Sequence, residues 1–171
     1  MAVQSVKPKI EDVASNVLSG EVLKNALDFV AYLRDNKLNP IWSAQNAWKV
    51  SSKTFTVCFI RLYGAAEYHG LSAGEWNITP FIGEYGADDL SAGNKKIALD
   101  NKKNCSPCGI CALQLDKIFG EKFPTACEAS IHFHNPNSAA VECAKEIVAL
   151  RKNEIKEGRA AKHKYVALQD R

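Results

Sequence analysis

The stretch TFTVCFIRL, residues 54–62, decides the fold class of this chain. It is rich in β-branched and aromatic residues, which favour strands. Successive side chains of a strand point to opposite faces of the sheet. One face here carries Phe55, Val57, Phe59 and Arg61, and the other carries Thr56, Cys58, Ile60 and Leu62. Because both faces are mainly apolar, the stretch predicts a central strand that is covered on both sides.

Helical patterns lie on both sides of this β-rich region. Apolar residues recur at helical spacing over 10–18 and 21–36, and the second helix is expected to end before Pro40. A long helix is expected from Ala139, with its cap within Asn135–Ser138. Further strands are expected at 48–50, 75–81 and 129–133, and a short helix at 95–103. The sequence therefore predicts one α+β domain, residues 1–171, in which an antiparallel sheet is flanked by N- and C-terminal helices.

Composition and charge narrow the classes of partner. A chain of 171 residues with 46% hydrophobic and 24% charged residues is typical of a globular domain. The net charge of +3 is too small to indicate nucleic acid. The first nine residues lack the apolar region of a secretory signal, and no apolar run approaches the roughly 18 residues of a membrane span. We therefore expect a cytoplasmic protein with no membrane partner, in which clustered cysteines indicate a metal site more than disulfides.

The strongest chemical signal is a cysteine cluster within residues 104–128. Three thiols stand at CxxCxxC spacing, and Cys127 follows sixteen residues after the third. The stretch Ile118-Phe-Gly120 predicts a turn that brings the chain back as a hairpin. Thiolates are ligands for zinc and for iron–sulfur clusters. We expect residues 104–128 to be a Cys-rich insertion whose metal ligands are Cys105, Cys108, Cys111 and Cys127.

The identity of the metal is open between two readings of the same cysteines. The CxxCG turn, Cys105 to Gly109, is typical of structural zinc sites. The CxxCxxC spacing with a remote cysteine resembles the ligand set of a [4Fe–4S] cluster, although no proline follows Cys127. A redox dithiol is a third reading. Zinc in a structural role is the preferred interpretation, because it would hold together a loop that is poor in apolar residues.

His132 and His134 are possible substitute ligands. On a strand, the HxH spacing places both imidazoles on one face, with Phe133 pointing into the core. Such a pair can also support a catalytic zinc, but a solvent-facing strand edge is the preferred interpretation. The sequence contains no P-loop, GxGxxG, HExxH or GxSxG pattern and indicates no catalytic residue. Cys58 and Cys143 are expected to be small core residues.

Aromatic residues and a basic C-terminal segment complete the candidate features. Trp76 and Tyr68 are possible lining residues of a small-molecule pocket. Residues 151–164 contain six Lys or Arg and two Glu, a net charge of +4. A solvated segment, continuing as a basic and partly flexible tail over 156–171, is preferred to a phosphate-binding surface because aromatic residues are not interleaved with the charges.

Several of these stretches resemble a group of small uncharacterised bacterial proteins. The resemblance extends from about residue 26 to residue 155 and rests on the following segments: Leu27–Leu33, Asn46–Val50, Cys105–Cys111, Ile118–Phe123 with Cys127, and Asn135–Pro136 with Glu142–Lys145. The resemblance implies an intracellular bacterial protein with a recurring cysteine segment, and it implies no activity.

Two functional hypotheses follow. In the first, the chain is a binding or sensing module that holds a structural, colourless zinc ion and takes a small-molecule ligand. In the second, the same cysteines hold an iron–sulfur cluster that carries electrons or senses oxygen. The sequence favours the first hypothesis and indicates no particular oligomeric state.

Overall fold

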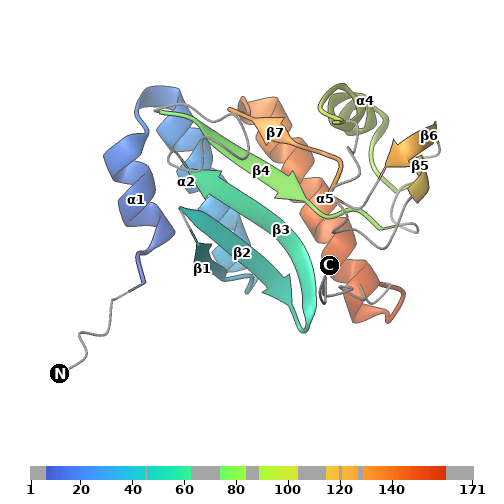
Figure 1. Cartoon of the computed structure of the whole chain (residues 1–171), viewed down its shortest axis with the longest axis horizontal. Coiled ribbons are helices and arrows are strands. Elements are labelled where there is room, and N and C mark those ends of the chain that lie inside the picture. Colours follow the sequence, from blue (N-terminus) through green and yellow to red (C-terminus); the bar gives the residue numbers. More distant parts are fainter. Residues whose placement is uncertain are drawn as a thin grey trace, which may run out of the picture.

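A five-stranded antiparallel sheet forms the centre of the molecule (Figure 1). The computed structural model describes residues 7–44, 46–62, 74–83, 89–103, 115–119, 121–126 and 129–160. The strand order is β1-β2-β3-β4-β7. The strands are β1 (Pro40–Ala44), β2 (Ala47–Ser52), β3 (Phe55–Leu62), β4 (Trp76–Pro80) and β7 (Phe133–His134). The predicted central strand, β3, is the middle strand of the sheet.

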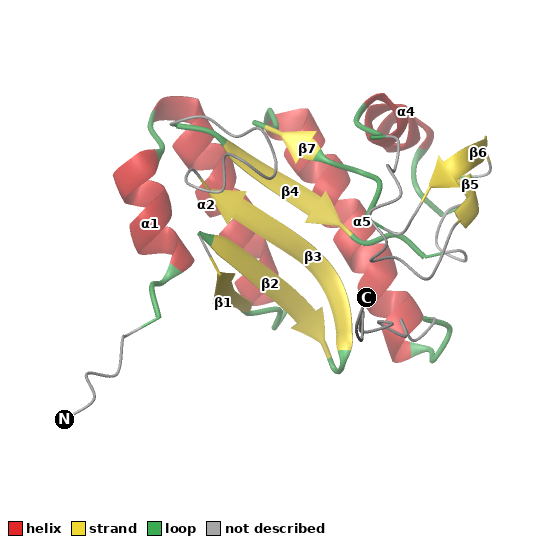
Figure 2. Cartoon of the chain, viewed as in Figure 1, coloured by secondary structure: helices red, strands yellow, loops and turns green. Residues whose placement is uncertain are grey.

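The main helices lie where the sequence predicts them. They are α1 (Ile10–Val17), α2 (Gly20–Asp35) and α5 (Ser138–Lys156). The two longest, α2 and α5, lie on the same side of the sheet (Figures 1 and 2). The predicted α+β class, with an antiparallel sheet and helices from both ends of the chain, is confirmed.

The hydrophobic core lies between the sheet and these helices. Cys58, Ile60 and Leu62 of β3 are fully buried on the helix-facing side. Phe29 of α2 and Val148 of α5 are fully buried against them in the same core. On the second face of β3, Val57 is fully buried, while Phe59 and Arg61 are only partly buried. The expected burial of both faces therefore holds on the helix side and only in part on the other.

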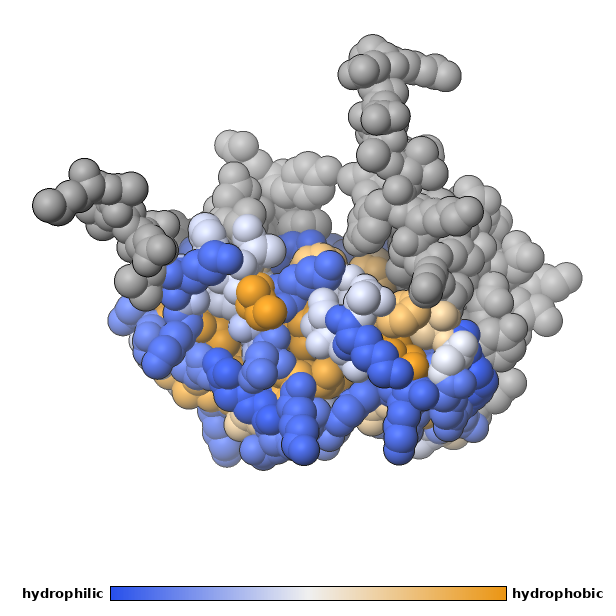
Figure 3. All heavy atoms as spheres, turned by 90° about the horizontal axis from the view of Figure 1, so that it is seen from below, coloured by the Kyte–Doolittle hydropathy of each residue, from blue (hydrophilic) through white to orange (hydrophobic). Residues whose placement is uncertain are grey.

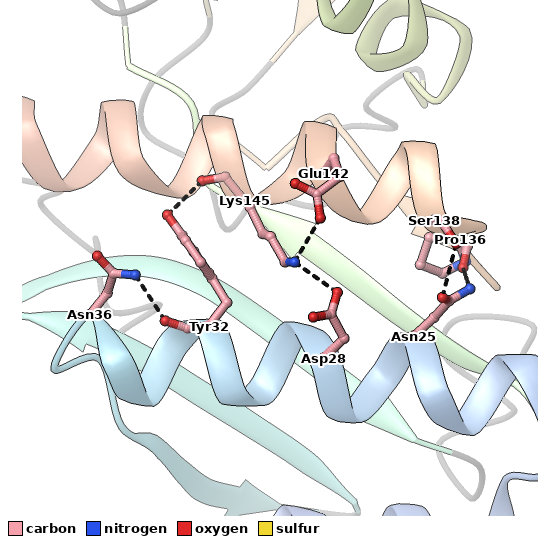
Figure 4. A network of polar contacts seen from close by, with 8 residues as sticks. All are labelled: Asn25, Asp28, Tyr32, Asn36, Pro136, Ser138, Glu142 and Lys145. Carbon is pink, nitrogen blue, oxygen red and sulfur yellow. Dashed lines mark hydrogen bonds and ion pairs between the residues drawn. The ribbon is translucent and has the colours of Figure 1, made fainter.

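Polar contacts join α2 to α5 along their length (Figure 4). Lys145 Nζ lies 2.7 Å from Asp28 Oδ2, and the Tyr32 hydroxyl donates to the Lys145 carbonyl at 3.0 Å. At the start of α5, the buried Asn25 side chain donates to the Pro136 carbonyl at 3.2 Å. These contacts fix α5, and β7 before it, relative to α2.

The cap of α5 supports a first prediction. Asn137 Oδ1 accepts a hydrogen bond from the backbone N–H of Ala140 at 2.9 Å. Asn137→Ala removes this acceptor and is expected to lower the free energy of unfolding by about 1 kcal/mol. Urea unfolding measures the change, and Asn137→Asp, which keeps the acceptor, is the matched control. Equal stability of the alanine and aspartate variants would contradict the capping role.

A short helix and a separate hairpin, which precede β7 in the sequence, lie on the β7 side of the sheet (Figure 1). The helix α4 (Ala92–Asp100) packs against α5, and the hairpin consists of β5 (Leu115–Ile118) and β6 (Glu121–Ala126). Helix α4 begins earlier than expected because Glu146 of α5 accepts hydrogen bonds from the Ser91 N–H at 2.9 Å and from its hydroxyl at 3.2 Å. A carboxylate from another helix thus caps the N-terminus of α4.

Two features differ from the expectations. The sequence predicted no strand at Pro40–Ala44, yet β1 pairs with β2 at the sheet edge. The basic segment that begins at Arg151 is not solvated at its start, because Arg151, Glu154 and Ile155 are each 2% exposed. The helix continues to Lys156, and residues 161–171 lie outside the described residues.

One face of the molecule is largely hydrophilic. Figure 3, which views the molecule from below, shows mainly hydrophilic residues with scattered hydrophobic ones between them. Among the described side chains, Ile41 on the edge strand β1 is the one large hydrophobic residue that is well exposed, at 59%. Within the same part of the chain, no helix combines the length and the apolar character that a membrane crossing requires.

Candidate functional site

The two chain segments that flank the Cys-rich stretch lie next to each other. The Lys103 N–H donates to the Ser130 carbonyl at 2.8 Å, and the His132 N–H donates to the Asn101 carbonyl at 3.0 Å. Lys102 and Ile131 form an antiparallel bridge between these two bonds. Residues 104–128 are therefore connected to the body through two adjacent, hydrogen-bonded chain segments next to β7.

The hairpin within this segment confirms the predicted turn. Strands β5 and β6 pair with Leu115 opposite Ala126 and Ile118 opposite Glu121. Phe119 has a positive φ of 50°, and Ile118 and Phe119 are only 1% and 2% exposed because they pack in the main core. The turn of the hairpin is thus anchored in the body. The predicted ligands Cys105, Cys108, Cys111 and Cys127 lie outside the described residues.

The two candidate histidines lie at the same edge of the sheet. Phe133 is fully buried in the core, while His132 is half-buried and His134 exposed, as the HxH alternation predicts. His134 Nε2 lies 3.2 Å from Glu75 Oε2, and His132 Nδ1 lies 3.4 Å from Thr79 Oγ1. Within the described ranges, no group of three or more His, Cys, Asp and Glu side chains is arranged to hold a metal ion. The role of either histidine as a substitute ligand stays a prediction.

A polar network that sequence reasoning missed lies on the second face of the sheet. Thr79 and Asn77 of β4 are 2% and 3% exposed, and the Thr79 hydroxyl donates to Asn77 Oδ1 at 2.9 Å. Arg61 of β3 donates to the same hydroxyl at 3.3 Å, and burial lowers the pKa of its guanidinium. His132 approaches from β7. The sequence signal was a charged residue inside the otherwise apolar stretch 54–62.

Aromatic side chains adjoin this polar network. The guanidinium carbon of Arg61 lies 5.1 Å from the centroid of the Phe59 ring, within the range of a cation–π contact. Phe59 in turn packs against Phe81, with ring centroids 5.9 Å apart. The second face therefore combines a cation, hydrogen-bond donors and an aromatic pair.

Of the two proposed pocket residues, only Trp76 belongs to the described part of the chain. Trp76 is fully buried on the helix-facing side, where its ring packs against Phe29 with centroids 6.5 Å apart. Trp76 is thus a core residue, like Trp48, and its position gives the pocket hypothesis no support. Tyr68 lies outside the described residues.

The two cysteines that were expected in the core are there. Cys58 and Cys143 are fully buried, and burial raises the pKa of the Cys58 thiol. Burial likewise raises the pKa of Cys143 to about 12. Both side chains are therefore neutral thiols at physiological pH, and neither has the thiolate character of a metal ligand or nucleophile.

Comparisons with protein-family models, with curated proteins and with solved structures found no match to this chain. The resemblance to small bacterial proteins therefore stays a prediction.

Proposed function

We propose that Cys105, Cys108, Cys111 and Cys127 bind one zinc ion that holds the insertion in shape within a small bacterial, cytoplasmic binding or sensing module. The observation that carries the proposal is the closure of residues 104–128: Lys103 is hydrogen-bonded to Ser130 at one end, and the hairpin pairs Leu115 with Ala126 at the other. Cys127 is the next residue after Ala126, and Cys105 follows Lys103 by two residues.

Chain length supports a common site. Cys105 follows Lys103 by two residues, and Cys127 follows directly after Ala126 and precedes Ser130 by three. Consecutive Cα atoms are about 3.8 Å apart, so the remote cysteine is tied both to the base of the insertion and to the open end of the hairpin. Cys111 precedes Leu115 by four residues and is tied to that same open end.

The size of the insertion explains why a metal is needed. Of its three described side chains, those of Ile118, Phe119 and Glu121, the first two lie in the core. Units below about 40 residues are seldom stable without a disulfide, a metal or a partner. Four thiolates around zinc supply the missing free energy, because binding to a site that is absent from the unfolded chain contributes directly to folding.

Metal analysis of anaerobically purified protein tests the proposal. We expect about one zinc ion per chain, four-coordinated by sulfur, and no visible absorption. Cys105→Ser with Cys108→Ser should lose the metal. Cys143→Ala, which removes a core thiol, is the matched control and should retain it. Metal-free wild-type protein would overturn the proposal.

The same measurement distinguishes the zinc site from an iron–sulfur cluster, the alternative that the CxxCxxC spacing favours. About four irons per chain and a broad absorption band near about 400 nm that bleaches in air would assign a cluster to these cysteines. In that case electron transfer or oxygen sensing would replace the structural zinc as the function.

A further inference from the structure

The second face of the sheet holds a cationic side chain that forms no ion pair with a carboxylate of the described residues. Arg61 is half-buried, and its described hydrogen bond goes to the neutral Thr79 hydroxyl. Among the described arginines, the other three each pair with a glutamate: Arg34 with Glu11, Arg151 with Glu154 and Arg159 with Glu157. No carboxylate of the described residues forms an ion pair with Arg61. A charge removed from water in this way is unfavourable until an anion reaches it.

Among the described residues, the groups around Arg61 offer more hydrogen-bond donors than acceptors. A threonine hydroxyl has one hydrogen to donate, and Thr79 gives it to Asn77 Oδ1 at 2.9 Å. Arg61 therefore donates to the Thr79 hydroxyl, and His132 Nδ1 lies 3.4 Å from the same oxygen. The guanidinium has five N–H groups, of which one is used in this network. The chemistry that completes such a set is an acceptor with negative charge.

The apolar surroundings of Arg61 restrict what carries that charge. The Phe59 ring lies under the guanidinium, Phe81 packs on Phe59, and Val57 of the same face is fully buried. Ligand sites commonly combine apolar walls with a few polar groups that fix orientation. A planar carboxylate matches the guanidinium fork, and an aromatic body matches the phenylalanine pair.

We infer that the second face of the sheet binds a small aromatic carboxylate, with its carboxylate on Arg61 and its ring against Phe59 and Phe81. Thr79 and Asn77 position the guanidinium, and His132 lies beside it. This inference rests on the proposed function only in that it names the ligand class of the proposed binding module. It requires no metal, so the two can fail separately.

Isothermal titration calorimetry of the full chain with benzoate tests the inference. For so small a ligand we expect a dissociation constant of about 1 mM. Benzamide, which has the same shape and no charge, should bind about 10-fold more weakly or not at all. Arg61→Gln should lose benzoate binding about 10-fold or more, and Arg61→Lys, which keeps the charge without the fork, should lie between it and the wild type.

Two controls separate recognition from folding. Arg159→Gln makes the same substitution at an exposed arginine near the end of α5 and should bind benzoate like the wild type. In the absence of ligand, Arg61→Gln should unfold at the same urea concentration as the wild type or a higher one, because it removes a partly buried charge.

Several results would overturn the inference. If the wild type does not bind benzoate, or if the wild type and Arg61→Gln bind it equally well, Arg61 does not recognise the ligand. Tighter binding of inorganic phosphate or acetate than of benzoate would overturn the aromatic carboxylate class. Zinc content measured on the same Arg61→Gln preparation should equal that of the wild type. If zinc is absent from both while benzoate still binds, the metal proposal fails and the ligand inference stands.

Discussion

The Cys105→Ser, Cys108→Ser double variant is expected to lower the free energy of unfolding by about 3–6 kcal/mol and to become cleavable by protease within residues 104–128. The expected loss follows from the anchor of the hairpin. Ile118 and Phe119 are 1% and 2% exposed in the core, and burying one such side chain contributes about 1.5–3 kcal/mol. If the metal no longer orders the insertion, both side chains lose the support that holds them in place.

The measurement exploits the position of the tryptophans. Trp48 and Trp76 are fully buried in the core formed by the sheet and the helices, so their fluorescence reports on the body and not on the insertion. In buffer the variant should keep the native emission, and in urea it should unfold at a lower midpoint. Limited proteolysis followed by mass spectrometry locates the first cleavage.

The Cys143→Ala variant is the control for loss of a thiol. It removes a fully buried side chain from α5, so it should be less stable than the wild type while retaining the wild-type metal content and protease resistance within residues 104–128. If the double variant has the urea midpoint and the cleavage pattern of the wild type, the cysteines contribute nothing to the order of the insertion.

Much of the fold was predictable because local patterns and tertiary packing agree. The apolar spacing of residues 21–36 became α2, which buries Phe29 and Leu33, and the apolar stretch 54–62 became the central strand. The turn at Ile118–Gly120 was also correctly placed between two strands. In each case the residues that favour the element also supply its buried surface.

Elements that depend on distant residues were missed or misplaced. Pro40 was interpreted as part of a helix stop signal. The helix ends earlier, at Asp35, and Pro40 begins β1 at the sheet edge, where a missing N–H is tolerated. The start of α4 depends on Glu146, which is more than fifty positions away in the sequence. No local pattern contains such a cap.

The same reason limits prediction of the site. The HxH alternation correctly placed both histidines on one face, because strand geometry is local. Their partners come from another part of the chain: Thr79 belongs to β4, and Glu75 directly precedes that strand. No spacing rule in the sequence connects these two residues with the histidines. Arg61 was visible as a charge within a strand. Only the sheet register places it opposite Asn77, where its side chain reaches Thr79 and no described carboxylate.

The buried pair of α5 carries the second large expected effect. Arg151 Nη1 lies 3.1 Å from Glu154 Oε2, and the two side chains are 1% and 2% exposed. Glu154→Gln leaves the buried charge of Arg151 without this carboxylate and is expected to lower the free energy of unfolding by about 3–5 kcal/mol. Urea unfolding measures the loss. The matched control is Glu157, which forms an exposed ion pair with Arg159. Glu157→Gln should change the free energy of unfolding by less than about 1 kcal/mol.

The surroundings of Glu154 explain why relaxation should not rescue the variant. Its carboxylate packs directly on Gly83, where even a Cβ would overlap it, and Phe119 from the hairpin turn lines the same small cavity. The pair thus lies where α5, the end of β4 and the anchor of the insertion meet. Replacing both charges at once, with Arg151→Met and Glu154→Leu, removes the desolvated ions together and should recover most of the loss. If this double replacement is as unstable as Glu154→Gln alone, the loss comes from packing at this junction and not from an uncompensated charge.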